Sequence, residues 1–443
     1  MVRQALGAGL VSFTVAVGAL GASAGTTAAS QVERVVSPGG IEAYLLSESS
    51  IPFLSLSLDF RGGAALDPEG REGLAYMVSG LLDEGAGELD SQAFRTELED
   101  RAIRLSFDAG RDQFTGEFKT LTEHRERAFE MLRLALSEPR FDAEPVERIR
   151  NQIQASLRRR AEDPDYLAAQ TWFAGAFPGH PYGRPVQGTV ESIGRITVAD
   201  LEGFVDRRLA KDNLVIGVAG DITAAELAPL LDRAFGDLPA RAAPVAIPPA
   251  TPAGEGTVIL RKDVPQSAVL FGETGIRRDD PDFYAAYVAN HILGGGGFTS
   301  RLTEEVREKR GLAYSVYSYL YPLDAAPLWI GGLGTANAAV GDALQVVRQE
   351  IAQMAEGAIT QAALDDAKTY LTGSFPLRLT SNDGIAAQLV QMQVDDLGID
   401  YLERRNDYIE AATLEDVRRA AARLYDPAQL LVVVVGEPEG LAE

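Results

Sequence analysis

The sequence repeats one pattern of strands, loops and helices in its two halves. The stretch LSLDFRGGAALDPEG (56–70) is echoed by AVLFGETGIRRDDPDF (268–283), and each is a strand-like run, a glycine-containing loop and an Asp-Pro turn. A closing stretch, LVIGVAGD (214–221), is echoed by LLVVVVGEP (430–438). Opening and closing runs start 158 residues apart in the first half and 162 in the second. Any two mixed stretches look somewhat alike, but agreement of order, spacing and turn chemistry favours two similar structural units.

Helix and strand signals are mixed without strict β-α-β alternation, which favours α+β layers over a parallel sheet. Each half is therefore predicted to be a largely antiparallel sheet with helices on one face. Apolar periodicity predicts helices in both halves. The predicted helices are 72–83, 90–103, 124–137, 144–163, 283–293, 340–357, 360–375 and 413–425. Thr413 and Asp416 have the spacing of a helix-capping box.

A segment rich in proline and alanine marks the seam between the halves. The window 239–256 contains five prolines, which suit an extended linker. A chain of 443 residues exceeds one ordinary core. The predicted segments are a signal peptide (1–24), an N-terminal domain (30–240), a linker (241–256) and a C-terminal domain (257–443).

The N-terminus has the pattern of a secretory signal peptide. One early charge, Arg3, precedes an apolar run over 5–22 that closes on Ala22-Ser23-Ala24. An uncleaved membrane anchor is the alternative, but the run is rich in glycine and alanine and would make a poor span. We expect an exported protein, periplasmic or secreted, with no stable membrane span.

Charge and cysteine content exclude several classes of partner and site. The formal net charge of −23 disfavours nucleic acid, because its phosphates would be repelled. Cysteine is absent, so disulfides, thiolate metal sites and cysteine nucleophiles are excluded.

The stretch GLAYMVSGLLDEG (73–85) resembles a catalytic helix from which the catalytic groups are missing. Its leucines, methionine and valine form one apolar stripe. Tyr76, Ser79 and Gly80 share another face, at the spacing with which H-x-x-E-H would hold zinc and a base. The sequence therefore keeps the helix pattern but lacks the ligands.

The three histidines make a poor zinc site. Hydrolytic zinc requires about three nitrogen or oxygen ligands and a base, and His124, His180 and His291 are scattered. His180 lies in a Pro/Gly turn and is interpreted as structural, His291 as half-buried and His124 as solvated. Asp83 and Glu84 are interpreted as a solvated helix end.

Three segments resemble a known family. The stretch HILGGGGFTSRLTEEVREKRGLAYSVYSYL (291–320) closely resembles the C-terminal-domain signature of the M16 zinc peptidases, the group of insulinase, pitrilysin and mitochondrial processing peptidase. FPGHPYGRPVQGT (177–189) is similar to the family's H-P-Y-G segment, and 60–76 resembles the approach to its zinc helix. The resemblance implies two homologous α+β domains of M16 type that form half of a clam-shell chamber, which a second short chain closes.

The resemblance also implies that this chain is a non-catalytic subunit. The family's H-x-x-E-H falls on the helix where this sequence has Tyr76, Ser79 and Gly80, and its third ligand, a glutamate, falls near Gln154-Ala155-Ser156. We therefore expect no metal or other cofactor in this chain, and zinc in a homologous partner that carries H-x-x-E-H.

Arg307 and Tyr314 are the predicted substrate-binding residues. In the family, an arginine and a tyrosine seven residues apart in the C-terminal domain reach the substrate near zinc, and REKRGLAY supplies both here. A guanidinium can bind a carbonyl or carboxylate, and a phenol can donate to an oxyanion. The alternative is structural: Arg307 pairs with Glu304 or Glu305, and Tyr314 packs on a strand.

A run of four glycines is the last candidate feature. Gly294, Gly295, Gly296 and Gly297 lack the Gly-Lys-Ser/Thr of a phosphate loop. They form either a flexible turn between helices or a short version of the family's substrate loop.

Two functional hypotheses follow. The first is a catalytically silent subunit of a heterodimeric zinc metallopeptidase that degrades peptides. The second is a non-catalytic scaffold or peptide-binding protein. An active metalloenzyme with an unusual site is disfavoured by the histidine count.

Overall fold

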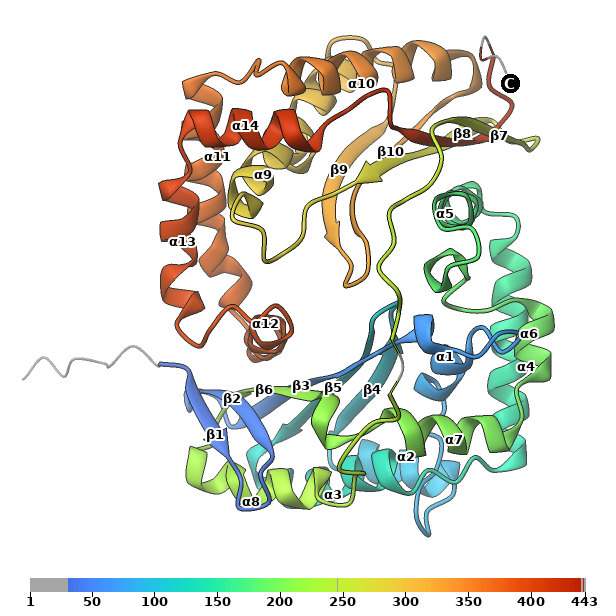
Figure 1. Ribbon diagram of the computed structural model, residues 1–443. Helices are drawn as coiled ribbons and strands as arrows, with labels where there is room; N and C mark the ends of the chain where they lie inside the picture. Colours follow the sequence, from blue (N-terminus) through green and yellow to red (C-terminus); the bar gives the residue numbers. More distant parts are fainter. Residues whose placement is uncertain (1–30, 245, 440, 442–443) are drawn as a thin grey trace, which may run out of the picture.

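The computed structural model describes residues 31–244, 246–439 and 441. The predicted signal peptide, 1–24, lies outside this part of the chain. The described chain forms two sheets, one from each half, with most helices on the sides that face away from each other (Figure 1). No helix in the described ranges combines the length and apolar composition needed to cross a bilayer.

The first sheet has six strands in the order β1-β2-β6-β3-β5-β4. Only β2 and β6 pair in parallel, and all other neighbours are antiparallel. Alternation explains the strands: Leu54, Leu56, Leu58 and Phe60 of β3 are buried on one face. The strands are β1 (Glu33–Val36), β2 (Glu42–Ser47), β3 (Phe53–Arg61), β4 (Arg104–Ala109), β5 (Gln113–Leu121) and β6 (Leu214–Gly220).

The second sheet has five strands in the order β7-β11-β8-β10-β9. Its one parallel pair is β7 with β11. Strand for strand, this order repeats β2-β6-β3-β5-β4 of the first sheet, so the predicted duplication is confirmed and β1 is an addition. The strands are β7 (Gly256–Arg261), β8 (Gln266–Thr274), β9 (Ser315–Pro322), β10 (Pro327–Ala336) and β11 (Leu431–Gly436).

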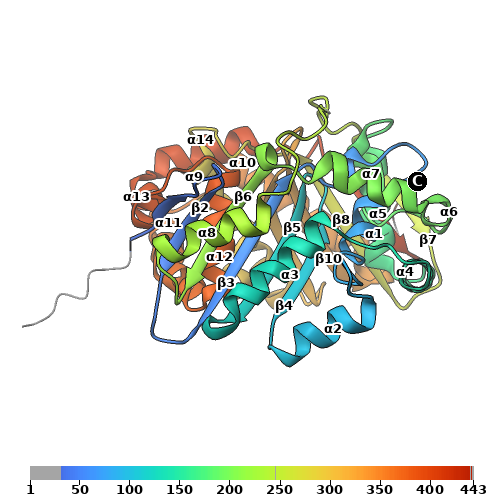
Figure 2. The ribbon, with the colours of Figure 1, turned by 90° about the horizontal axis from the view of Figure 1, so that it is seen from below.

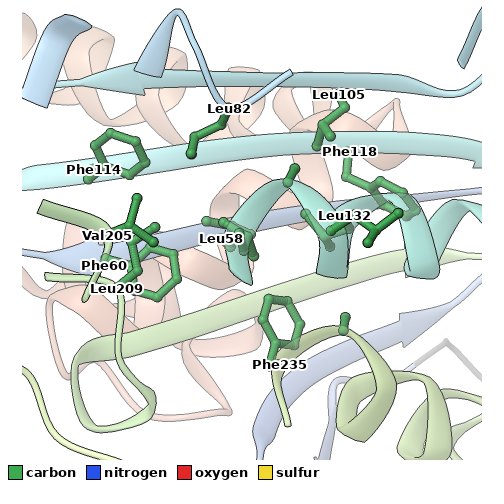
Figure 3. Close-up of a cluster of buried hydrophobic side chains, with 14 of the residues drawn as sticks. Leu58, Phe60, Leu82, Leu105, Phe114, Phe118, Leu132, Val205, Leu209 and Phe235 are labelled. Atoms are coloured by element: carbon green, nitrogen blue, oxygen red, sulfur yellow. The ribbon is translucent and has the colours of Figure 1, made fainter. Parts of the chain in front are cut away.

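Helices of the first half, except α5 (Pro164–Ala176), cover the outer face of the first sheet (Figure 2). They bury one apolar core with β3, β5 and β6, part of which is drawn in Figure 3. Leu58 and Phe60 of β3 face Leu132 and Phe235 in this core. The helices are α1 (Leu74–Ser79), α2 (Ser91–Asp100), α3 (Arg125–Ser137), α4 (Ala143–Arg160), α5 (Pro164–Ala176), α6 (Val190–Arg195), α7 (Val198–Arg208) and α8 (Ala224–Phe235).

Helices of the second half, except α12 (Asn382–Val394), cover the outer face of the second sheet and bury a separate core. The capping box predicted at Thr413 and Asp416 is confirmed at the start of α14. The helices are α9 (Phe283–Asn290), the π-helical turns η5 (His291–Gly295) and η7 (Thr303–Glu308), α10 (Val340–Ala355), α11 (Gln361–Ser374), α12 (Asn382–Val394), α13 (Tyr401–Ala411) and α14 (Leu414–Leu424).

The two halves exchange one helix each. Helix α5 packs on β8 and β11 of the second sheet, and α12 packs on β6 and β3 of the first (Figure 1). Glycines permit the close approach: a Cβ on Gly272 would lie 2.8 Å from the Trp172 ring, and one on Gly217 would lie 2.3 Å from a carbonyl of α12. The domain boundaries drawn from sequence did not include this exchange.

A buried polar bridge also joins the halves. The Tyr182 hydroxyl donates to Asp112, and it accepts from the backbone N–H of Ala325 at 2.9 Å. Asp112 also accepts from the N–H of Asp324 at 3.0 Å. The H-P-Y-G segment therefore fixes the β9–β10 hairpin of the second half to the first half.

Two helices differ from their predicted extents. Helix α1 ends at Ser79, because Gly80 weakens the helix and residues 80–83 continue as turns. Leu81 and Leu82 nevertheless remain buried. Helix α9 ends at Asn290 and continues into the π-helical turn η5, where the glycines begin.

Candidate functional site

The face of α1 that carries Tyr76, Ser79 and Gly80 is occupied by packing contacts and by a local hydrogen bond. Tyr76 packs against the first core, and Ser79, 5% exposed, donates its hydroxyl to the Tyr76 carbonyl at 2.9 Å. Gly80 faces Ile149 of α4. The side-chain amide of Gln154 is likewise bound, to the carbonyl of Val190 at 2.9 Å. This donor set does not fit zinc, which requires imidazole or carboxylate ligands held open to the metal.

The predicted solvated helix end at Asp83 and Glu84 is wrong. Glu84 is 6% exposed and accepts hydrogen bonds from Ser91, Arg95 and Arg148. Burial alone would raise the pKa of Glu84, but Arg148, Ser91 and Arg95 together lower it. Asp83, beside it, has its pKa raised to about 6 by burial and by the Glu84 charge. Glu84 therefore joins α2 and α4 through Arg95 and Arg148.

The three histidines lie in three different environments. His180 Nε2 contacts the Pro248 carbonyl at 2.9 Å and its Nδ1 accepts from the Tyr182 N–H, so its structural interpretation holds. His124 is partly exposed beside Glu123. His291 is more buried than expected, at 8% exposure. In the ranges that the structure describes, no group of three or more metal-ligating side chains is placed to hold an ion.

Arg307 and Tyr314 come together at the start of β9. The Arg307 guanidinium carbon lies 5.2 Å from the Tyr314 ring centroid and 4.9 Å from that of Phe298. Tyr314 is 78% exposed and Phe298 71%. The guanidinium also pairs with the neighbouring Glu308 at 3.3 Å. Sequence analysis missed Phe298, although an aromatic residue directly after four glycines was a usable signal.

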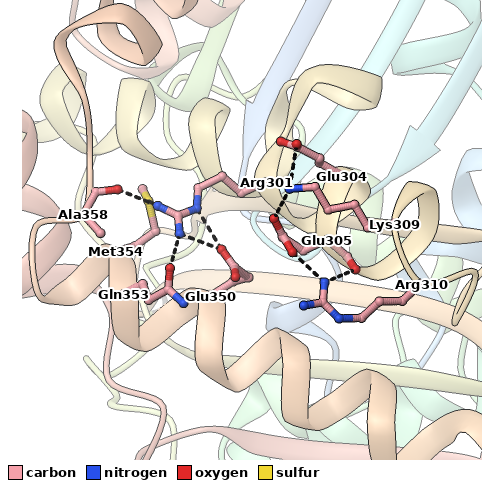
Figure 4. Close-up of polar contacts among 9 residues, drawn as sticks. All are labelled: Arg301, Glu304, Glu305, Lys309, Arg310, Glu350, Gln353, Met354 and Ala358. Carbon is pink, nitrogen blue, oxygen red and sulfur yellow. Dashed lines mark hydrogen bonds and ion pairs between the residues drawn. The ribbon is translucent and has the colours of Figure 1, made fainter.

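The structure differs from the structural alternative for this pair, since Arg307 pairs with Glu308 and not with Glu304 or Glu305. Glu304 and Glu305 are occupied by Lys309, at 2.9 and 2.6 Å, and Glu305 is also bound by Arg310 (Figure 4). The side chain of Tyr314 is exposed and does not pack on a strand. Arg307 is therefore held by Glu308 and by two exposed aromatic rings.

The glycine segment packs closely on its surroundings. A Cβ on Gly294 would lie 2.7 Å from the backbone nitrogen of Ser318 in β9, and one on Gly295 would lie 2.9 Å from Asn290. Gly297 has a φ of +57°. Close packing therefore gives the first two glycines a structural role and leaves Gly297 as a turn residue.

A tyrosine face lies along β9, an edge strand. Tyr317, Tyr319 and Tyr321 occupy alternate positions, with successive ring centroids 6.2 Å apart. Tyr317 and Tyr319 remain 45% and 42% exposed. A Cβ on Gly332 of β10 would lie 2.8 Å from the Tyr317 hydroxyl, so glycine lets this ring lie across the sheet. The alternation in SVYSYLYP predicted this face, but sequence analysis did not use it.

Family comparisons match both halves of the chain. The family described as Insulinase (Peptidase family M16) matches residues 44–190, and the Peptidase M16 inactive domain matches residues 195–371. A Helicobacter pylori protein named Non-peptidase homolog YmxG is 30% identical over 371 residues, covering 84% of this chain and 85% of that protein. An uncharacterized zinc protease of Mycobacterium leprae is 30% identical over 293 residues, covering 64% and 65%.

Solved structures agree with these matches. A crystal structure of a peptidase M16 inactive domain from Pseudomonas fluorescens has a TM-score of 0.87 at 29% identity, covering 93% of this chain and 99% of that one. A Helicobacter pylori protease shares the fold, with a TM-score of 0.81 at 20% identity over 91% and 99% of the two chains.

Proposed function

Because the chain belongs to the M16 family of insulinase-type peptidases and has lost the zinc motif of that family, we propose that it is the non-catalytic subunit of a heterodimeric zinc metallopeptidase. It is a non-peptidase member of the family. A homologous partner would supply H-x-x-E-H and zinc, and this chain would close the chamber. The site of action would be the periplasm or the exterior, in keeping with the export pattern of residues 1–24.

The observation that carries the proposal is the exposed cluster of Arg307 and Tyr314. A buried arginine–tyrosine pair could be explained by packing alone. Packing does not explain an arginine that lies between two rings that are each more than 70% exposed. The guanidinium would bind a peptide carbonyl or carboxylate, and the phenol would donate to the oxyanion that forms at the partner's zinc. Substrates would be unfolded peptides, bound as an added strand at an open sheet edge.

The test uses this chain together with a motif-bearing M16 protein, sought first in the neighbouring reading frame. Arg307→Ala combined with Tyr314→Phe should lower kcat/KM of the pair at least 100-fold, the usual effect of removing an oxyanion donor. Arg310→Ala is the matched control, since Arg310 pairs with Glu305 at the surface. Full activity of the double variant would contradict the proposal.

A scaffold or peptide-binding protein without peptidase function is the second candidate. The exposed tyrosines Tyr317 and Tyr319 favour it, because they can bind peptide without any metal. Under this function, assembly or peptide binding would persist in the double variant and no partner would gain activity from the wild-type chain.

A further inference from the structure

A separate pocket, which Phe298, Arg307 and Tyr314 do not line, lies in the second half of the chain. It is a cavity of about 520 Å³ between the start of η5, η7 and helix α11. Its floor is apolar, because Ile292, Ile359 and Ala367 are 7%, 1% and 4% exposed. Nothing in the proposed function uses this pocket, so it can be considered independently.

His291 provides an unpartnered polar group inside this pocket. It lines the cavity and is 8% exposed, and within the described ranges neither ring nitrogen has a hydrogen-bond partner. Burial lowers the pKa of His291, so the imidazole is neutral at pH 7 and offers one acceptor nitrogen and one N–H. Its ring stacks on Tyr370 with centroids 5.0 Å apart.

The guanidinium that lines the pocket is not available to a ligand. Arg301 donates through Nε and Nη2 to Glu350, through Nη2 to Gln353, and through Nη1 to Ala358 and Met354 (Figure 4). All five of its N–H donors are therefore used, and its charge is balanced by Glu350. A carboxylate or phosphate ligand would find no free cation here.

The rim of the pocket favours a positive charge. Asp366 is exposed on α11 and Glu304 lies on η7, both lining the cavity. Glu305 also lines the cavity, but Glu304 and Glu305 are paired with Lys309 and Arg310, so Asp366 is the principal source of uncompensated charge. Tyr370, 59% exposed, presents a ring against which a cation can lie.

We propose that this pocket binds an organic cation, a guanidinium or primary amine carried on an aliphatic chain. The chain would lie on the apolar floor, and the cationic group would lie against Tyr370 and Asp366 with an N–H directed to the acceptor nitrogen of His291. Two sources share this chemistry: the arginine or lysine side chain of a peptide, and a free amine.

Histidine NMR of the full chain tests the proposal without a partner or an activity assay. The chain has three histidines, so the imidazole signals can be resolved and assigned with His291→Gln. Agmatine should shift the His291 signals saturably, with a Kd of about 1 mM for so small a ligand, and leave His124 and His180 unmoved. Butylurea, its neutral counterpart, and butyrate should not shift them.

A capped arginine-containing tetrapeptide distinguishes the two sources. Binding at least tenfold tighter than agmatine assigns the pocket to a peptide side chain, and equal binding assigns it to a free amine. Asp366→Asn and Tyr370→Ala should each weaken agmatine about fivefold, whereas Asp365→Asn, one position along α11 and outside the pocket, should not. If agmatine does not shift the His291 signals, or if butylurea shifts them equally, the proposal is overturned. This outcome is independent of whether the chain acts in a peptidase.

Discussion

The segments that connect equivalent strands in the two halves differ in how far their side chains are buried. In the first half, residues 62–103 join β3 to β4, and in the second half, residues 275–314 join β8 to β9. The first connection is closed: Leu82 is fully buried and Glu84 is 6% exposed. The second ends in the open cluster of Phe298, Arg307 and Tyr314.

This difference teaches how to interpret a lost catalytic site. Where the zinc motif would lie, its positions have been taken over by packing, so the first connection now serves stability. The second connection keeps exposed aromatic and charged groups that the fold does not need.

Trp172→Ala should have the largest effect. The ring is fully buried on Gly272 of the other half, and its N–H donates to the Leu431 carbonyl at 3.0 Å. We expect the free energy of unfolding to fall by about 3 to 5 kcal/mol in urea titrations. Leu389→Ala, on the reciprocal helix α12, is the comparison and should cost about 2 to 4 kcal/mol. A loss under about 1 kcal/mol for Trp172→Ala would disprove the exchange of helices as a source of stability.

Asp59→Asn should stabilise the protein at alkaline pH. Asp59 is the third residue from the end of β3, the position that Gly272 occupies in the equivalent strand β8. The Asp59 side chain is buried, at 1% exposure, and its carboxylate has no hydrogen-bond partner among the described residues. Burial raises the pKa of Asp59 to about 7. The folded state therefore holds a proton that the unfolded state has released, so wild-type stability falls as pH rises from about 4 to about 7.

The variant should lose this pH dependence and gain about 2 to 3 kcal/mol at pH 8, with little change at pH 4. Urea unfolding at both pH values measures it. Parallel pH profiles for Asp59→Asn and wild type would contradict the assignment.

Glu84→Gln compares the two connections directly. It should cost about 2 kcal/mol at pH 7, because Arg95 and Arg148 lose a buried carboxylate. The lowered pKa of Glu84 means that its contribution is present above the unfolded value of about 4.3 and is lost as pH falls through the folded value. Glu305→Gln, whose pairs are at the surface, should cost less than about 1 kcal/mol. Equal losses of unfolding free energy in the two variants would contradict the contrast between the buried first connection and the exposed second connection.

Replacing Tyr317 and Tyr319 by alanine should have the smallest effect. Loss of these two half-exposed rings should weaken the binding of an unfolded peptide about fivefold, measured by fluorescence anisotropy. Val258→Ala is the control, since Val258 is 43% exposed on β7 at the other edge of the sheet. Unchanged affinity would restrict recognition to the Arg307 cluster.

Local sequence patterns predicted much of this fold. The features that depend on tertiary contacts could not be predicted from the sequence. Alternation, turn chemistry and the repeat predicted the duplicated α+β fold, and the resemblance to the M16 signature predicted Arg307 and Tyr314 as a pair. Sequence could not predict that α5 and α12 would cross between halves, because that depends on close contacts at Gly272 and Gly217. It also missed the burial of Glu84, because Arg148 lies on a distant helix.

The most direct test of the division of labour is metal analysis and peptide cleavage by the purified chain, alone and mixed with a partner that carries H-x-x-E-H. We predict no stoichiometric zinc and no cleavage for the chain alone, and cleavage by the mixture. One equivalent of zinc together with cleavage by the chain alone would contradict the account.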